Sequence, residues 1–323
     1  MKTNNIYKEN EMSKIAMIFA GQGSQAVGMG KDFYENSKLA REMFEKAGDR
    51  IGVDFKELIF EENEKLGQTA YTQPAILLVQ MIAYKLFREE CPDVKPALFL
   101  GHSLGEFSAL CAAGAIDYVD AVELVHKRGA YMQEACDTIE AGMMAIVGLD
   151  DAAVEKICAD AQAEGKKVWP ANYNQDGQLV VAGMKSDLAS LEQTFKDAGA
   201  KRALLLNMSV ASHCDILAPA QEPLAELMEK YITDNFEAPV ISNVTTKPYS
   251  TKAEAVELLK EQLVKPVKYK QSIQAIAPEV DMAIEFGNGV VLKGLNRRIA
   301  KDLKTLNVSD TASLEKVKEE VCL

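Results

Sequence analysis

At 323 residues, the chain is long enough for a substantial core, and for two domains or one large domain with an insertion. With 48% hydrophobic and 26% charged residues it has the composition of an ordinary globular protein, and its net charge of −12 argues against a general nucleic-acid binder. The sequence has no long apolar run and no signal-type segment, so we expect a cytoplasmic protein without a membrane partner. Six cysteines without C-x-x-C spacing and three scattered histidines predict reduced thiols and no metal site.

The first expected strand covers residues 15–19 and leads into a glycine-rich loop. Gly21-x-Gly23 begins like a dinucleotide fingerprint, but four residues rather than two precede Gly28. We interpret these glycines as allowing backbone NH groups to approach a reacting centre, with Gln22 as a candidate oxyanion donor. A plain tight turn is the alternative.

Two long helices are expected on either side of the next strand. Thr72-Gln73-Pro74 indicates a helix start, with threonine as the cap and proline in the first turn. A second helix is predicted from about 117 to 137, and it carries His126 and Arg128 among apolar residues. From this pattern alone, Arg128 is best explained as a solvated or snorkelling side chain.

Between these helices, Gly101-x-Ser103-x-Gly105 has the spacing of a nucleophile elbow. The apolar run after Pro96 predicts a buried strand, and the alanine-rich segment after Ser103 predicts a helix that ends near Gly114. Ser103 would project from the strand end, and the backbone NH of Leu104 would point to where an oxyanion forms. The alternative is a glycine-rich turn without chemistry.

From about residue 142 the hydrophobic period changes. Six elements are predicted in the order strand, helix, strand, strand, helix, strand, which is that of a ferredoxin-like module. Their expected ranges are 143–149, 152–163, 168–174, 178–184, 187–198 and 202–206. We predict an α/β protein: a hydrolase-like core with a mainly parallel sheet (1–138 and 210–323) and an inserted ferredoxin-like small subdomain (139–209).

His213 follows the insertion, in a loop before a helix expected over 215–232. His126 lies inside a helix, and His102 diverges from its neighbour Ser103 at the strand end, so His213 is the best candidate for a general base. The order serine then histidine suits a hydrolase-like arrangement. A surface-loop histidine is the alternative.

The rest of the chain predicts strands at 239–244 and 282–286, followed by a helix over 290–299. Gly287-Asn288-Gly289 lies between the last strand and that helix, with four residues rather than two before Gly294, so it is not a dinucleotide fingerprint either. The charged tail after Lys304 is expected to be helical near its end.

Taken together, the motifs resemble those of the malonyl-CoA:acyl-carrier-protein transacylases of bacterial fatty-acid synthesis, over about residues 15–299. The segments that carry the resemblance are Gly21-Gln22-Gly23-Ser24-Gln25, Thr72-Gln73-Pro74-Ala75, Gly101-His102-Ser103-Leu104-Gly105-Glu106, Arg128-Gly129, Ser212-His213 and Gly287-x-Gly289.

The resemblance implies a ping-pong transfer of a malonyl group from malonyl-CoA to an acyl carrier protein. Ser103 would carry the acyl group and His213 would be its base, while Arg128 would pair with the malonyl carboxylate. The NH groups of Gln22 and Leu104 would form the oxyanion hole. No cofactor is implied, because the CoA thioester is a substrate and the partner carries the phosphopantetheine. A monomer is expected.

The chain departs from the family pattern at Ala20, at Asn288 and at Lys268, where proline, proline and glutamine are common. Carbonyl groups orient the histidine in the family, so the resemblance implies that role for Asn243 and for the main chain of Lys268. The small residues Val210-Ala211-Ser212 before the histidine leave methylmalonyl open beside malonyl.

Two other classes of function compete with the transferase. A serine thioesterase or hydrolase on a related core normally places an acid between serine and histidine, and no acidic residue stands at an obvious core strand end in that interval. A non-catalytic binding module would leave the elbow, the histidine and the arginine unexplained together.

Overall fold

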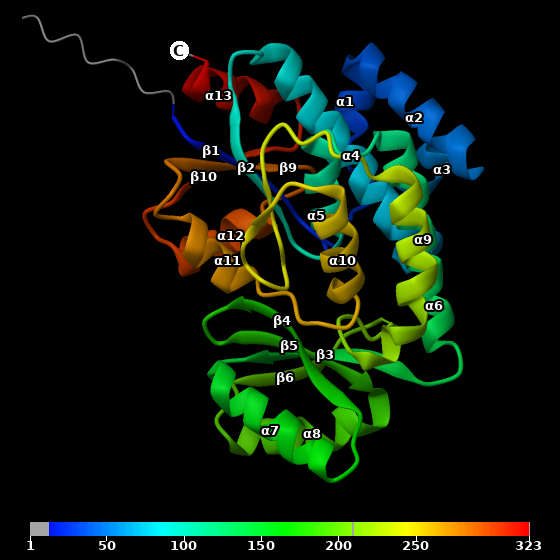
Figure 1. The fold of residues 1–323 in the computed structure, drawn as a ribbon, viewed down its shortest axis with the longest axis vertical. Coiled ribbons are helices and arrows are strands. Elements are labelled where there is room, and N and C mark those ends of the chain that lie inside the picture. The colour runs from blue at the N-terminus through cyan, green and yellow to red at the C-terminus, as the bar shows by residue number, and fades with distance from the viewer. Residues whose placement is uncertain (1–12, 209, 323) are drawn as a thin grey trace, which may run out of the picture.

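The computed structural model describes residues 13–208 and 210–322, and these residues form two β-sheets with helices around them (Figure 1). In the large sheet, all neighbours pair in parallel except the last two, which are antiparallel. Its strand order is β10 (Lys304–Val308), β9 (Met282–Phe286), β1 (Ile15–Phe19), β2 (Pro96–Gly101), β7 (Val240–Ile241), β8 (Pro248–Tyr249).

Strand β1 shows why the large sheet has helices on both faces. All five of its residues are apolar and buried. Because side chains alternate across a strand, Met17 and Phe19 join the core on one face, whereas Ala16 and Ile18 join the core on the other. The second of these cores includes Ile273 from the helix Tyr269–Ile276, so the sheet is the middle layer of three.

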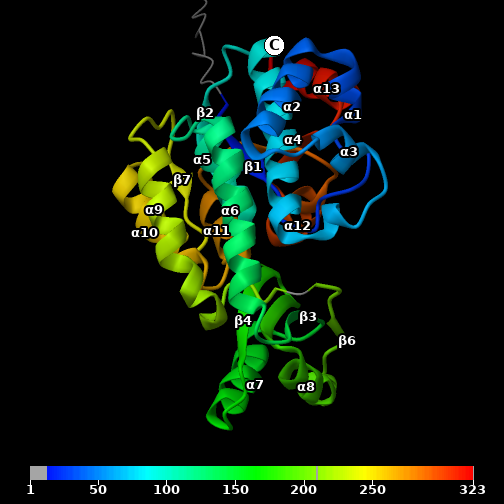
Figure 2. The same ribbon diagram turned by 90° about the vertical axis from the view of Figure 1, so that its right-hand side faces the viewer.

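The helices of the large unit surround this sheet (Figures 1 and 2). They are α1 (Lys31–Asn36), α2 (Lys38–Ile51), α3 (Phe55–Phe60), α4 (Thr69–Glu90), α5 (Leu104–Ala112), α6 (Tyr118–Cys136), α9 (Gln221–Tyr231), α10 (Lys252–Gln262), α11 (Tyr269–Ile276), α12 (Val291–Ile299) and α13 (Thr311–Val321), with 3-10 turns at Lys65–Gly67 and Asp215–Ala220.

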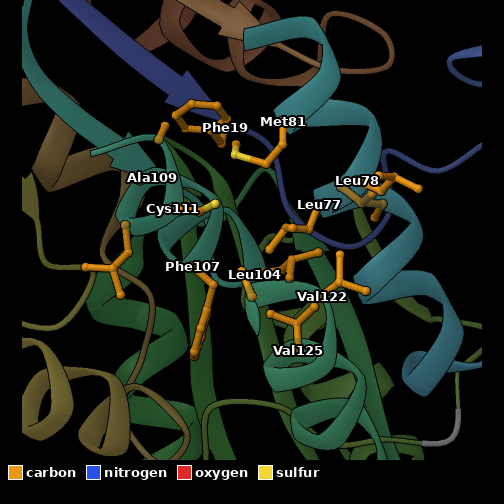
Figure 3. Packing of buried hydrophobic residues seen from close by; sticks show 14 of the residues in the cluster. Phe19, Leu77, Leu78, Met81, Leu104, Phe107, Ala109, Cys111, Val122 and Val125 are labelled. Atoms are coloured by element: carbon orange, nitrogen blue, oxygen red, sulfur yellow. The ribbon is translucent and has the colours of Figure 1, made fainter. Parts of the chain in front are cut away.

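Helix α5 packs tightly between the sheet and its neighbours. Figure 3 shows Leu104 of α5 between Leu77 of α4 and Val125 of α6, and all three side chains are buried, as is Phe107 of α5. Each large side chain in such a core contributes roughly 1.5–3 kcal/mol of burial free energy. The turn that precedes α5 is therefore anchored on its helical side.

The register of the parallel strands brings three loops to one edge of the sheet. Phe19 at the end of β1 lies beside Gly101 at the end of β2 and beside Phe286 at the end of β9. The loops that follow these strands consequently emerge together. The amide of Asn288 donates to the carbonyl of Ser24 at 2.7 Å, which ties the first loop to the last.

The small sheet has the predicted βαββαβ order. Its strands pair antiparallel in the order β4 (Val168–Gln175), β5 (Gln178–Met184), β3 (Ala141–Val147), β6 (Arg202–Leu205), and the two helices are α7 (Asp151–Ala163) and α8 (Lys185–Asp197). Both helices lie on the side of the sheet away from the large unit, below it in Figure 1. The fold class is thus confirmed, whereas the exact boundaries 138/139 and 209/210 stay a prediction, and Ser209 lies outside the described residues.

Several element boundaries differ from the sequence-based expectation. Helix α4 begins three residues before the expected cap, and the hydroxyl of Thr72 instead donates to the carbonyls of Leu66 and Gln68 inside the first turns. The helix expected over 215–232 is a 3-10 turn followed by α9, and the strand expected over 239–244 shortens to β7. Strand β10 was not expected, because it is short and only two of its five residues, Leu306 and Val308, are apolar.

The prediction that the cysteines are reduced is wrong for one pair. Cys91, just after α4, is joined to Cys322, just after α13, by a disulfide. The other four cysteines are buried thiols. In the described part of the chain, no helix is long and apolar enough to cross a membrane.

Candidate active site

Ser103 occupies a strained turn between β2 and α5. Its φ and ψ are 54° and −106°, a conformation that side-chain-bearing residues rarely adopt. A Cβ atom on Gly101 would lie 1.8 Å from the carbonyl carbon of Gly105, and one on Gly105 would lie 2.0 Å from the carbonyl oxygen of Phe19. Both glycines are therefore required by backbone packing, and the predicted elbow is present.

His213 faces the serine hydroxyl. Its Nε2 lies 2.8 Å from Ser103 Oγ, and its Nδ1 lies 2.7 Å from the carbonyl oxygen of Gln262. Because a carbonyl only accepts, Nδ1 carries the proton, and Nε2 of the neutral ring is left to accept from the serine. Burial, and then the charge of Arg128, lower the pKa of His213 to about 3, so the ring is neutral near pH 7.

Arg128 reaches the same serine from α6. Its Nη2 donates to Ser103 Oγ at 3.3 Å and to Gln262 Oε1 at 3.0 Å, and its Nη1 donates to Gln73 Oε1 at 2.8 Å. The guanidinium lies over the ring of Phe107, 5.0 Å from its centre. The residue is only 1% exposed, and burial lowers its pKa to about 10. The snorkelling interpretation is therefore wrong.

The two candidate oxyanion donors border the elbow. Leu104 is the first residue of α5. Gln22 lies in the loop after β1, and this loop is held beside the elbow because the carbonyl of Phe19, at the end of β1, accepts a hydrogen bond from the NH of His102 at 3.0 Å. Among the described residues, no acceptor takes the backbone NH of Gln22 or of Leu104. Both NH groups are thus available, and one of them is at a helix N-terminus, where negative charge is favoured.

The residues expected to orient His213 make other contacts. The carbonyl of Asn243 accepts from the NH of Lys268 at 2.9 Å, and the carbonyl of Lys268 accepts from Ser272 within the first turn of α11. Neither carbonyl reaches the imidazole, and Gln262 supplies that contact instead. Asn243 still belongs to the site, because its Oδ1 accepts from the NH of Ser103 at 2.7 Å.

The other two histidines point elsewhere, as expected. His102 Nε2 lies 2.8 Å from Asn174 Oδ1 on β4, which connects the elbow to the small sheet. His126 Nδ1 lies 2.7 Å from the carbonyl of Ala70. Neither imidazole contacts Ser103.

Sequence reasoning did not assign a role to three residues of this cluster. Gln73 and Glu106 lie inside two of the motifs that carry the family resemblance, so the sequence already indicated that they could belong to the site. Gln262 ends a charged helix and follows no recognisable pattern. Only the folded chain brings it to Ser103, to whose carbonyl its Nε2 donates at 3.1 Å.

Within the described ranges, no group of three His, Cys, Asp or Glu side chains is arranged to hold a metal ion. The chemistry of this edge comes from a hydroxyl, a neutral imidazole and a buried guanidinium around one oxygen atom.

Comparison with known proteins relates this arrangement to one family. The model of the acyl transferase domain family matches residues 16–319. The malonyl CoA-acyl carrier protein transacylase of Haemophilus influenzae is 40% identical over 310 residues, which are 95% of this chain and 99% of that protein.

Solved structures agree with the sequence comparison. The crystal structure of the malonyl-CoA:acyl carrier protein transacylase of Helicobacter pylori superposes with a TM-score of 0.93 at 46% identity, covering 96% of this chain and 98% of that one. A malonyl-transacylase in complex with a type II polyketide-synthase acyl-carrier protein superposes with a TM-score of 0.90 at 38% identity, covering 95% and 100% of the two chains. These matches confirm the resemblance that the motifs indicated.

Proposed function

The chain belongs to the acyl transferase domain family, and we propose that it transfers a malonyl group from malonyl-CoA to an acyl carrier protein for fatty-acid synthesis. The acceptor is the phosphopantetheine thiol of the carrier, and the acyl group passes through an ester on Ser103.

One observation carries this proposal: the guanidinium of Arg128 and the imidazole of His213 both contact Ser103 Oγ, at 3.3 Å and 2.8 Å. An anion held by Arg128 therefore lies next to the atom that attacks. In a malonyl thioester a single carbon separates the carboxylate from the thioester carbonyl, so binding the first presents the second to the serine. A fork of two parallel hydrogen bonds from Arg128 suits a carboxylate.

The proposed first half-reaction forms the ester. His213 Nε2 takes the proton of Ser103 as Oγ bonds to the thioester carbonyl carbon, and the NH groups of Gln22 and Leu104 receive the developing oxyanion. The carbon–sulfur bond then breaks, and CoA leaves with the proton from His213. In the second half-reaction the carrier's thiol gives its proton to His213 as its sulfur bonds to the ester carbonyl carbon. The bond from that carbon to Ser103 Oγ then breaks, and His213 returns the proton to Oγ.

The partners and setting follow from this proposal. Acyl carrier protein is the second substrate, as the complex of a related transacylase suggests. No cofactor enters either half-reaction. We propose a monomer in the cytoplasm. The relatives are malonyl transacylases, which supports malonyl as the acyl group, although the small residues before His213 would also leave room for methylmalonyl.

The serine hydrolase alternative finds no support in the geometry. Such enzymes orient the histidine with an acid, but Nδ1 of His213 is held by the backbone carbonyl of Gln262. A buried arginine at the nucleophile also has no role toward neutral esters.

Intact-mass spectrometry tests the proposal directly. The protein is mixed with malonyl-CoA alone, and one malonyl adduct is expected, located on the peptide that contains Ser103. The Ser103→Ala variant should fold and remain unlabelled. Labelling that persists in this variant, or steady CoA release without any adduct, would contradict the acyl-serine route.

A further inference from the structure

Glu106 is a fully buried carboxylate that the proposed reaction does not use. It lies in the first turn of α5 and is 0% exposed. Its Oε2 accepts from the backbone NH of Asn243 at 3.1 Å and from Gln262 Nε2 at 2.7 Å. Asn243 and Gln262 each form a hydrogen bond with the backbone of Ser103.

Asn243 braces the strained turn. Its side chain accepts from the NH of Ser103 and donates to the carbonyl of Gly101, each at 2.7 Å. These two bonds occupy backbone groups on both sides of a residue whose φ is 54°. The contact from Glu106 to the NH of Asn243 fixes the backbone from which this brace extends.

Gln262 connects the three groups of the proposed chemistry. Its backbone carbonyl accepts from His213 Nδ1 at 2.7 Å, its Oε1 accepts from Arg128 Nη2 at 3.0 Å, and its Nε2 donates to the carbonyl of Ser103 at 3.1 Å. The two ends of an amide have nearly the same shape but opposite hydrogen-bonding roles. Turned the other way, the amide would set its NH2 against the guanidinium, where both groups can only donate.

An ionised carboxylate can only accept, so Glu106 decides which end of the Gln262 amide faces it. We propose that Glu106 is a positioning residue: through Gln262 and Asn243, it holds the serine, the histidine and the arginine in their common arrangement. This inference rests on the proposed function of Ser103, His213 and Arg128.

The position of Glu106 carries a cost in stability. Burial raises the pKa of Glu106 to about 7, against the weaker opposing effects of Gln262, Asn243, Tyr249 on β8 and Arg128 on α6. The folded state thus binds more protons than the unfolded state between the ordinary glutamate pKa and about 7. Stability conferred by the protonated form is lost as the pH rises through this window. Because burying this carboxylate in its ionised form costs stability, a role in the site explains it better than a role in stabilising the fold.

Glu106→Gln tests the proposal at pH 8, with Ser108→Ala as the matched control. Ser108 is a buried residue of the same helix, and its hydroxyl has no hydrogen-bond partner among the described residues. We expect Glu106→Gln to lower the rate of Ser103 acylation at least about tenfold, the loss of one charge-assisted hydrogen bond, while the melting temperature stays equal or rises. The loss should appear with both malonyl-CoA and acetyl-CoA, because serine and histidine are affected as well as arginine.

The outcomes separate this inference from the proposed function. Wild-type acylation in Glu106→Gln, or a lowered melting temperature with the wild-type rate per folded molecule, would overturn the positioning role. Absence of any malonyl-serine in the unaltered protein would instead overturn the proposed function.

The wild-type pH profile gives a second measurement that needs no variant. His213 stays neutral well below pH 7, whereas Glu106 protonates near pH 7, so the rate of acylation should fall between pH 8 and pH 6. A flat profile over this range would overturn the inference.

Discussion

Arg128 and Lys270 are both buried cations, but their surroundings differ. Lys270, in α11, meets Asp151 Oδ2 at 2.5 Å and Asp176 Oδ1 at 3.0 Å, so two residues of the small unit neutralise it. Arg128 donates hydrogen bonds only to the neutral oxygens of Gln73, Gln262 and Ser103, and no carboxylate of a described residue forms an ion pair with it. Glu106 acts on Arg128 from beyond ion-pair distance and raises its pKa less than burial lowers it.

The difference distinguishes a structural cation from one that is set to bind an anion. An isolated buried charge costs several kcal/mol, which an opposite charge within the protein can offset. The side chain of Lys270, 10% exposed, has its counter-charges and helps to attach the small unit to the large one. No carboxylate of the described residues lies within hydrogen-bonding distance of Arg128, and a substrate carboxylate would supply that counter-charge.

The largest expected effect extends this comparison to the histidines. His213→Ala should slow acylation by roughly 10²–10⁴-fold, because the serine loses its proton acceptor. His126→Ala is the control, since that ring contacts the carbonyl of Ala70 and not the serine. The rate of CoA release in a single turnover measures acylation in both variants. If both variants lose the same rate while their stability is unchanged, His213 is not the base.

Arg128→Ala tests the unpaired cation itself. Losing a charge-assisted bond of roughly 1.5–3 kcal/mol should lower malonyl transfer at least tenfold and up to a few hundredfold in kcat/KM. Acetyl transfer should suffer much less, and Arg128→Lys should fall between, because lysine keeps the charge without the fork. An unchanged ratio of malonyl to acetyl transfer would refute the carboxylate-binding role.

Lys270→Met tests the paired cation. Both aspartates keep access to water, at 22% and 79% exposed, so the expected loss is roughly 1–2 kcal/mol of unfolding free energy in a urea titration. The ratio of malonyl to acetyl transfer should stay at the wild-type value. A change in that ratio would contradict the conclusion that Lys270 has only a structural role.

Exposed cations should have the smallest effect. Lys293 and Arg297 are exposed cations on α12, and we predict that this helix binds the acidic carrier protein. The N-terminal NH groups of α12 are not free for the carrier, because those of Leu292 and Lys293 donate to the carboxylate of Glu285. Reversing both charges should raise KM for the carrier several-fold, with KM for malonyl-CoA unchanged, since an exposed pair contributes roughly 0.2–1 kcal/mol.

The control for that experiment is Lys46→Glu on α2, which changes the net charge at another exposed position. Lys201 and Arg202 form another exposed pair of cations, and we predict that the carrier docks there if its KM is unaltered after reversal on α12.

What the sequence predicted best was local or periodic. The apolar strand Ile15–Phe19, the βαββαβ order of the small unit and the elbow at Ser103 all have signals within a few residues, and all three are present. The pairing of Ser103 with His213 was also predicted, because one other histidine was expected inside a helix and the other diverges from the serine at the strand end.

What the sequence did not predict depends on long-range contacts. The carbonyl that holds His213 belongs to Gln262, at the end of an unremarkable charged helix, and no pattern separates it from that of Lys268. Strand β10 has few apolar residues, because it lies at the edge of the sheet and needs only β9 as a partner. The pairing of Cys91 with Cys322 likewise requires the ends of two distant helices to meet.

The order of strands in the large sheet has a consequence for how the chain is made. Strand β1 leaves the ribosome first, yet one of its two neighbours is β9, which begins only at Met282. During most of synthesis one edge of this apolar strand therefore has no partner. An unpaired strand edge favours association with other chains, so a nascent chain that still lacks β9 should depend on a chaperone to stay soluble.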